Sequence, residues 1–265
     1  MGGLRRARHE GGGVRKAATT STSSYWRFDA ETPASLRLVC FPHAGGSAGA
    51  YRHWSRLVSP ETELCVAQYP GRQERFSEQA PSDLSALGAA VAAALHAETS
   101  LPTVLFGHSM GATIAAETAF GLHALGDPPA LLVASASRAP GLHGDLDPTD
   151  HDDNELIGRM PYLSDDDRRA YADPDLGPLL TAVLRSDLLA LSGHRAGAVP
   201  PLPTPVVCVA AADDPHFGAD DAGDWQRFTE QPIRTIGFGG GHFYLSREPG
   251  AVVAAVEDLA REVLR

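Results

Sequence analysis

The chain has 265 residues and a formal net charge of −11, with 43% hydrophobic and 21% charged residues. This composition predicts one large globular domain with a substantial core, and it excludes a chain that is disordered along its length. The negative charge argues against binding to nucleic acid or to an anionic membrane, and no apolar stretch approaches the ~20 residues of a membrane span.

The first 24 residues differ from the rest of the chain. They hold five basic residues against one acid and are rich in Gly, Ser and Thr, without the apolar core of a signal peptide. We therefore expect a disordered basic arm over residues 1–24 and a single domain over residues 25–265. Three cysteines, Cys40, Cys65 and Cys208, each lie in an apolar run, which is typical of buried thiols in a cytoplasmic protein.

Strands and helices alternate along the predicted domain. Short, continuous apolar runs predict strands buried on both faces, as in a parallel sheet, at residues 36–41, 64–67, 104–106, 131–134, 206–209 and 233–238. Apolar residues at helical spacing, or an Ala-rich composition, predict helices over residues 82–98, 109–125 and 251–264. This alternation predicts a three-layer α/β fold with a mostly parallel central sheet.

One stretch, at about residues 141–197, lacks a strand candidate. It is punctuated by Pro148, Pro161, Pro174 and Pro178, and its first part, residues 141–175, has eleven acids and three arginines. We expect short helices that form an insertion above the sheet.

The strongest chemical signal is the pentapeptide G-H-S-M-G at residues 107–111. It follows a predicted strand and begins a predicted helix, which is the context of a nucleophile elbow. The glycines permit the tight turn that raises the Ser109 hydroxyl clear of the sheet. We therefore predict that Ser109 is a nucleophile. The alternative is a serine that only caps the helix.

A nucleophilic serine needs a base, and His242 is the candidate. It follows three glycines, between the last predicted strand and the C-terminal helix. The order nucleophile, acid, histidine is the one found in α/β-hydrolases. The alternative is a loop histidine in solvent. His108, beside the serine, is expected only to pack against the site.

The acid of the triad should follow a late strand and precede His242. The strand candidate at residues 206–209 leads to Asp213 and Asp214, and either carboxylate could hold the tautomer of the histidine. Asp214 is preferred because it directly precedes the proline at this strand–loop junction, and Asp213 is the alternative.

An acyl intermediate also needs backbone N–H donors for its oxyanion. Met110, the residue after the nucleophile, is expected to supply one. The loop after an early strand should supply the other, and there the segment F-P-H-A-G-G-S at residues 41–47 points to Ala44. The alternative for this loop is an ordinary Gly-rich turn.

Taken together, these motifs resemble those of the type II (editing) thioesterases of polyketide and nonribosomal-peptide assembly lines, over roughly residues 25–262. The matching segments are residues 41–47 with Tyr51 and Trp54, Y-P-G-R-Q-E-R at 69–75, G-H-S-M-G-A at 107–112, S-R-A-P at 137–140, Asp214-Pro215 with Trp225, and G-G-H-F-Y-L at 240–245. The segment L-R-S-D at 184–187 resembles a lid motif, whereas residues 192–195 depart from the pattern that follows it.

The resemblance implies an α/β-hydrolase fold with a helical lid at about residues 141–197. It implies hydrolysis of acyl thioesters on the phosphopantetheine arm of an acyl or peptidyl carrier protein, for editing or release, by Ser109, His242 and Asp214 without a cofactor or metal. We expect a cytoplasmic monomer that binds neither nucleic acid nor membrane. The alternatives are an esterase or lipase acting on oxygen esters, and a carrier-binding protein without activity.

Carrier proteins are commonly acidic, so an acidic enzyme should dock them through a local basic patch. Arg72, Arg75 and Arg138 lie on loops expected near the rim of the site. They could either contact the carrier or form internal ion pairs.

Overall fold

The computed structural model describes residues 20–21, 24–98, 100–160, 163–197 and 199–265. The basic arm expected over residues 1–24 therefore lies almost entirely outside the described residues. Of that segment, residues 20 and 21 form the short strand β1 (Thr20–Ser21).

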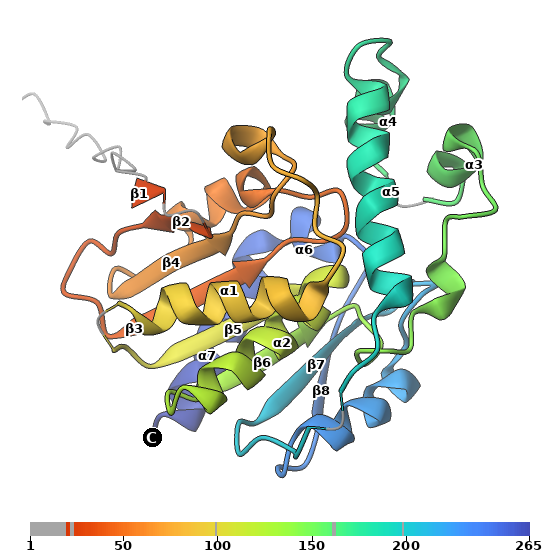
Figure 1. The fold of residues 1–265 in the computed structure, drawn as a ribbon. Helices are drawn as coiled ribbons and strands as arrows, with labels where there is room; N and C mark the ends of the chain where they lie inside the picture. The colour runs from red at the N-terminus through yellow and green to blue at the C-terminus, as the bar shows by residue number, and fades with distance from the viewer. Residues whose placement is uncertain (1–19, 22–23, 99, 161–162, 198) are drawn as a thin grey trace, which may run out of the picture.

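The described residues form one eight-stranded sheet in the order β1-β2-β4-β3-β5-β6-β7-β8 (Figure 1). The strands from β4 to β8 in this order are parallel, and β1 and β2 pair antiparallel at one edge. The bounds of the remaining strands are β2 Tyr25–Phe28, β3 Leu36–Phe41, β4 Thr62–Ala67, β5 Thr103–His108, β6 Leu131–Ser135, β7 Val206–Ala211 and β8 Arg234–Phe238. The predicted α/β-hydrolase architecture is confirmed.

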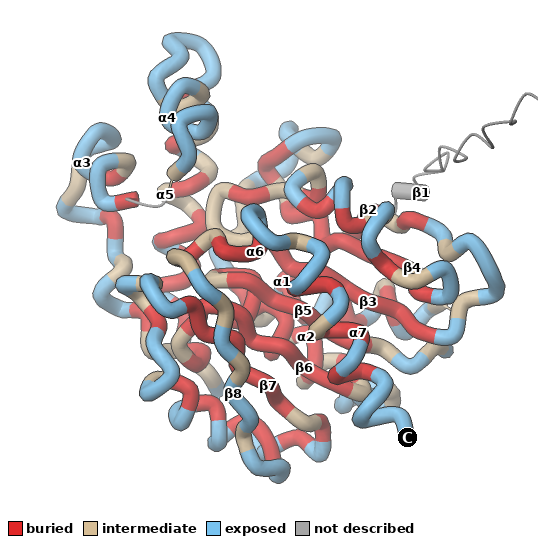
Figure 2. The backbone as a smooth tube through the Cα atoms, turned by 180° about the vertical axis from the view of Figure 1, so that it is seen from behind, coloured by how far each residue is buried: buried red, intermediate tan, exposed pale blue. Residues whose placement is uncertain are grey.

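Helices cover both faces of the sheet. In chain order they are η1 Ala48–Arg56, η2 Gln73–Arg75, α1 Leu84–His96, α2 Met110–Ala124, η3 Gly144–Leu146, α3 Asp153–Gly158, α4 Asp165–Ala172, α5 Gly177–Gly193, η4 Ala219–Phe228, α6 Tyr244–Arg247 and α7 Pro249–Val263, where η marks 3₁₀ geometry. Side chains of β3 alternate between the two faces, so that Val39 packs in the core with α1 and α2, whereas Leu38 packs with η1 and α7. Two cores therefore hold three layers together, and the strands between them are largely buried (Figure 2).

Two features of the sheet differ from the sequence prediction. The strand β8 is not buried on both faces: its residues are exposed or half-buried, because it pairs only with β7 and forms an edge of the sheet. The antiparallel strand β2 was not among the predicted strands. Its four residues, Y-W-R-F, contain Arg27, so the segment lacks a continuous apolar run of the kind that marks the other strands.

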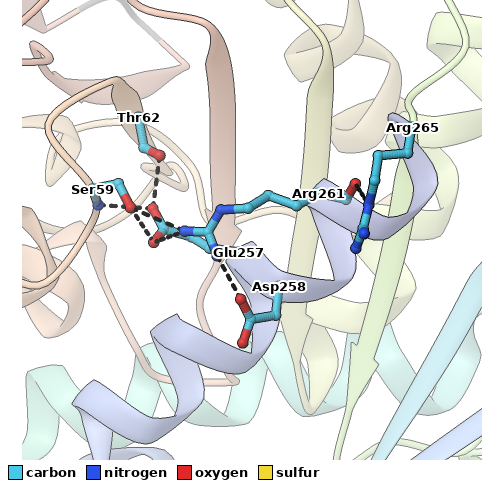
Figure 3. Close-up of polar contacts among 6 residues, drawn as sticks. All are labelled: Ser59, Thr62, Glu257, Asp258, Arg261 and Arg265. Atoms are coloured by element: carbon cyan, nitrogen blue, oxygen red, sulfur yellow. Dashed lines mark hydrogen bonds and ion pairs between the residues drawn. The ribbon is translucent and has the colours of Figure 1, made fainter.

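The C-terminal helix is fastened to the loop before β4 by a buried carboxylate (Figure 3). Both oxygens of Glu257 on α7 are used: they accept hydrogen bonds from the Ser59 N–H at 2.8 Å, the Ser59 hydroxyl at 2.6 Å and the Thr62 hydroxyl at 2.7 Å. Arg261, one turn further along the helix, lies 3.5 Å from the same carboxylate. This network fixes α7 on the face opposite α1 and α2.

The predicted helical insertion lies between β6 and β7. It contains η3, α3, α4 and α5, and α4 with α5 projects from the body of the fold (Figure 1). The expectation of short helices is wrong for α5, which has 17 residues and is not broken at Pro178. Proline is tolerated there because it lies in the first turn, where its missing N–H would have no helical partner.

In the described ranges, no single helix is long and apolar enough to cross a membrane. The pair α4 and α5 passes the same test together, by length and composition, but bends by 108° between its two members.

Candidate active site

Ser109 occupies a strained turn between β5 and α2. Its backbone has φ 55° and ψ −124°, which is uncommon for a residue with a side chain. The flanking glycines are required by space: a Cβ on Gly107 would lie 2.3 Å from the Gly111 carbonyl oxygen, and one on Gly111 would lie 2.0 Å from the Phe41 carbonyl oxygen. The sequence G-H-S-M-G therefore folds into an elbow that presses directly against the end of β3.

His242 and Asp214 form a buried pair beside this elbow. The His242 Nδ1 and Asp214 Oδ2 atoms are 2.8 Å apart, and the two side chains are 4% and 0% exposed. The other oxygen of Asp214 accepts a hydrogen bond from the His216 N–H at 2.9 Å. Asp213 is exposed, and its N–H donates to the Gly240 carbonyl at 2.9 Å. The structure thus places Asp214, and not Asp213, against the histidine, while Asp213 joins the two loops.

Three further imidazoles surround His242. The ring centroid of His108 is 5.0 Å from that of His242, His216 is 5.8 Å away, and His43 lies 6.1 Å from His108. Burial, and next the nearby His242, lowers the pKa of His43 to about 4, lowers the pKa of His108 well below its usual value, and lowers the pKa of His216. These three rings are therefore neutral at neutral pH. His242 differs from them because its ring is hydrogen-bonded to the carboxylate of Asp214.

His108 is held by a chain of hydroxyl groups that the sequence did not reveal. Its Nδ1 is 2.8 Å from the Ser135 hydroxyl, which is 2.6 Å from the Tyr244 hydroxyl. Tyr244 is part of the motif at residues 240–245, but Ser135 ends an apolar strand and carries no signal of its own. The packing role expected for His108 agrees with this buried network.

A cavity of about 450 Å³ opens at the elbow, and Ser109, Ala44 and His242 line it. Its far wall comes from the helical insertion and is mainly apolar, with the side chains of Leu156, Met160, Leu163, Leu180, Leu184, Leu188 and Leu191. In the part of the chain that the structure describes, no group of three His, Cys, Asp or Glu side chains is arranged to hold a metal ion. The arrangement suits nucleophilic attack on a substrate with an apolar group.

The two expected oxyanion donors come from the elbow itself and from the loop after β3. Met110 is the first residue of α2, where a backbone N–H has no acceptor within the helix. Ala44 is on the loop of residues 41–47, here called the oxyanion loop. Among the described residues, no hydrogen bond engages the N–H of Ala44 or of Met110. The next amide of the loop, Gly45 N–H, differs, because it donates to Asp187 at 2.8 Å.

The arginines considered for carrier docking are all in ion pairs. Arg72 is 6% exposed and pairs with Asp187, which closes it to any partner. Arg75 pairs with Glu78, and Arg138, which lines the cavity, pairs with Asp145. The interpretation as internal ion pairs therefore holds for Arg72, and the guanidinium groups of the other two are also engaged.

Residues 36–260 match a protein family described as the thioesterase domain. The chain is 34% identical over 233 residues to the "Probable cadicidin biosynthesis thioesterase" of Streptomyces griseus, which covers 87% of this chain and 64% of that protein. It is 36% identical over 230 residues to the thioesterase PikA5 of Streptomyces venezuelae, covering 84% of this chain and 81% of that protein. The chain thus spans less than two thirds of the first of these relatives.

Solved structures agree with this match. RedJ, a thioesterase from the prodiginine biosynthetic pathway in Streptomyces coelicolor, superposes with a TM-score of 0.78 at 33% identity, over 88% of this chain and 94% of RedJ. BorB, a type II thioesterase from the borrelidin biosynthetic cluster, gives a TM-score of 0.79 at 30% identity, over 92% of this chain and 98% of BorB.

Proposed function

The chain belongs to the thioesterase domain family, and on that premise we propose that it hydrolyses acyl thioesters with Ser109, His242 and Asp214 as its catalytic triad. One observation carries the proposal: the serine of a strained elbow and a histidine already paired with a buried carboxylate line the same cavity. A helix cap would need neither the paired histidine nor the cavity.

The proposed reaction follows from the positions of these groups. Neutral His242 takes the proton of Ser109 as the serine oxygen attacks the thioester carbonyl, and the carbonyl electrons move to an oxyanion. The N–H groups of Ala44 and Met110 stabilise that oxyanion. The carbon–sulfur bond then breaks, the thiol leaves with the proton from His242, and water activated by His242 releases the free acid from Ser109.

Asp214 has a specific part in this scheme. Its hydrogen bond to Nδ1 fixes the histidine tautomer in which Nε2 accepts the serine proton, and it stabilises the imidazolium that forms. The neighbouring His43, His108 and His216 stay neutral because their pKa values are lowered. They therefore add no positive charge that would oppose protonation of His242.

The substrate that we propose is an acyl group carried on the phosphopantetheine arm of an acyl or peptidyl carrier protein. The apolar wall of the cavity suits an acyl chain, and relatives of the chain take part in the biosynthesis of natural products such as prodiginine and borrelidin. We propose further that the insertion between β6 and β7 acts as the lid of this cavity. The three buried, unpaired cysteines support a cytoplasmic location.

The test is to load carrier proteins with acyl-phosphopantetheine and to follow their mass with and without enzyme. We expect the wild-type chain to remove the acyl group, and Ser109→Ala to lose on the order of 10⁶-fold in kcat. Asp213→Asn serves as a control variant because its side chain does not face His242. Hydrolysis by Ser109→Ala at a comparable rate would contradict the triad, and faster hydrolysis of simple oxygen esters would indicate an esterase.

A further inference from the structure

A buried ion pair connects the helical insertion to the body of the fold. Arg72, in the segment after β4, donates two hydrogen bonds to Asp187 on α5: Nη1 to Oδ2 and Nη2 to Oδ1, each at 2.7 Å. The side chains of Arg72 and Asp187 are 6% and 0% exposed. Because the geometry is bidentate and both groups are desolvated, the pair fixes the distance and the orientation between the two segments.

Both partners also hold the backbone of the oxyanion loop. Asp187 Oδ2 accepts a hydrogen bond from the Gly45 N–H at 2.8 Å, and Arg72 Nη1 donates to the Gly46 carbonyl at 2.9 Å. Within the loop, the Gly46 N–H donates to the His43 carbonyl at 2.9 Å. The peptide groups that follow Ala44 are therefore fixed by two side chains that come from other parts of the chain.

The oxyanion loop needs such support because of its composition. Gly45 has φ +77°, a region open to glycine, and two adjacent glycines leave the loop many other conformations. Space above the loop is also limited by the insertion: a Cβ on Gly45 would lie 3.3 Å from the Tyr171 hydroxyl and 3.5 Å from Leu184. The direction of the Ala44 N–H thus depends on contacts made by α4 and α5.

We propose that Asp187 is a positioning residue for the oxyanion hole. It acts through Gly45 and Arg72 to hold the Ala44 N–H in place, so the hole is complete only when α5 is seated on the oxyanion loop. This inference rests on the function proposed above and makes the lid helix part of the catalytic geometry. The competing interpretation is an ion pair that only stabilises the fold.

The two interpretations differ in how the chain binds a mimic of the intermediate. A trifluoromethyl ketone analogue of an acyl-pantetheine thioester accepts the Ser109 oxygen at its carbonyl carbon. The serine proton passes to His242, and the carbonyl electrons form an oxyanion. The corresponding amide analogue binds in the cavity without forming an oxyanion. The ratio of the two affinities therefore reports on the oxyanion hole and not on the cavity.

The first variant is Asp187→Asn. The asparagine side chain has a single carbonyl oxygen, which cannot accept hydrogen bonds from the Gly45 N–H and from both Arg72 nitrogens at the same time. We expect kcat and the affinity for the ketone to fall together on the order of 10²-fold, as for a donor displaced by about 1 Å. The KM and the affinity for the amide should change less than threefold. The matched control is Asp153→Asn, which breaks the Arg185–Asp153 ion pair between α5 and α3 at 2.7 Å and does not touch the loop. It should leave kcat and both affinities within twofold.

If Asp187→Asn does not fold, the double variant Arg72→Met/Asp187→Leu removes both buried charges and decides the question. A folded double variant with slow turnover and weak ketone binding supports the proposal. The proposal is overturned if a folded variant keeps its kcat, if it weakens the ketone and the amide equally, or if neither version folds. An inactive wild-type chain would instead refute the proposed function, so wild type and Ser109→Ala are measured first.

Discussion

Replacement of Gly111 by alanine tests how closely the elbow and the oxyanion loop are packed. The added Cβ would lie 2.0 Å from the Phe41 carbonyl oxygen, 2.6 Å from the Phe41 carbonyl carbon and 2.7 Å from the Pro42 carbonyl oxygen. All three atoms belong to the backbone, so no flexible side chain can move aside. To regain an ordinary contact of 3.4 Å, the start of α2 and the end of β3 must separate by about 1.4 Å.

The magnitude follows from this displacement. Overpacking in a rigid core lowers the free energy of unfolding by about 1–3 kcal/mol. Because the clash is with backbone atoms, we expect Gly111→Ala to lose about 3 kcal/mol. For a domain of this size, that lowers the Tm by about 6–12 °C. Because the clash separates Ser109 from the loop that carries Ala44, we also expect kcat to fall on the order of 10²-fold, as for a misplacement of about 1 Å.

Thermal unfolding and hydrolysis of an acyl-pantetheine thioester measure the two effects. The matched control is Gly250→Ala in α7, where an added Cβ meets nothing within 4 Å. That variant should be at least as stable as the wild type and keep its activity. A Gly111→Ala chain that keeps its Tm within 2 °C and its kcat within threefold would refute the tight packing of elbow against loop.

Three further predictions use other parts of the structure. Asp214→Asn should lower kcat on the order of 10⁴-fold in steady-state assays, because the histidine tautomer is no longer held, whereas Asp213→Asn should change it little. Burial, and next Arg138, lowers the pKa of His143 in the folded chain to about 4. As the pH falls, the unfolded chain therefore binds a proton at His143 before the folded chain does. Stability should therefore fall as the pH drops from 6.5 towards 4, by about 2 kcal/mol at pH 5, and urea titrations should show a smaller fall in His143→Gln. Glu257→Gln should lower the free energy of unfolding by about 2 kcal/mol in urea titrations, with kcat unchanged. The reason is that the group that binds α7 to Ser59 and Thr62 loses its charge.

The sheet was predictable from the sequence where strands are buried on both faces. The run at residues 36–41 coincides with β3, and the other central strands extend their predicted runs by at most two residues at either end. β8 shows the limit of this signal, since the apolar run at residues 233–238 predicts a strand but not its place at an edge. Sheet order is set by packing of the whole chain, which a local pattern does not contain.

For the candidate active site, the sequence indicates which residues to consider better than it indicates their contacts. The motifs around Ser109 and His242 locate these residues, because the turn requires glycines and the order of the groups along the chain is characteristic. The choice between Asp213 and Asp214 needed the loop conformation, which directs only Asp214 toward the imidazole. The contact of Arg72 with Asp187 joins residues 115 positions apart, and no local pattern indicates such a pair.

The buried pair of Arg72 and Asp187 has a consequence for protein engineering. Grafting the α3–α5 insertion from another thioesterase is an obvious route to a different acyl preference. A graft without a carboxylate at position 187 would leave a desolvated guanidinium without its counter-charge, at a cost of about 3–5 kcal/mol. The natural unit of exchange is therefore discontinuous: it comprises the insertion together with the segment around Arg72 and the two glycines of the oxyanion loop.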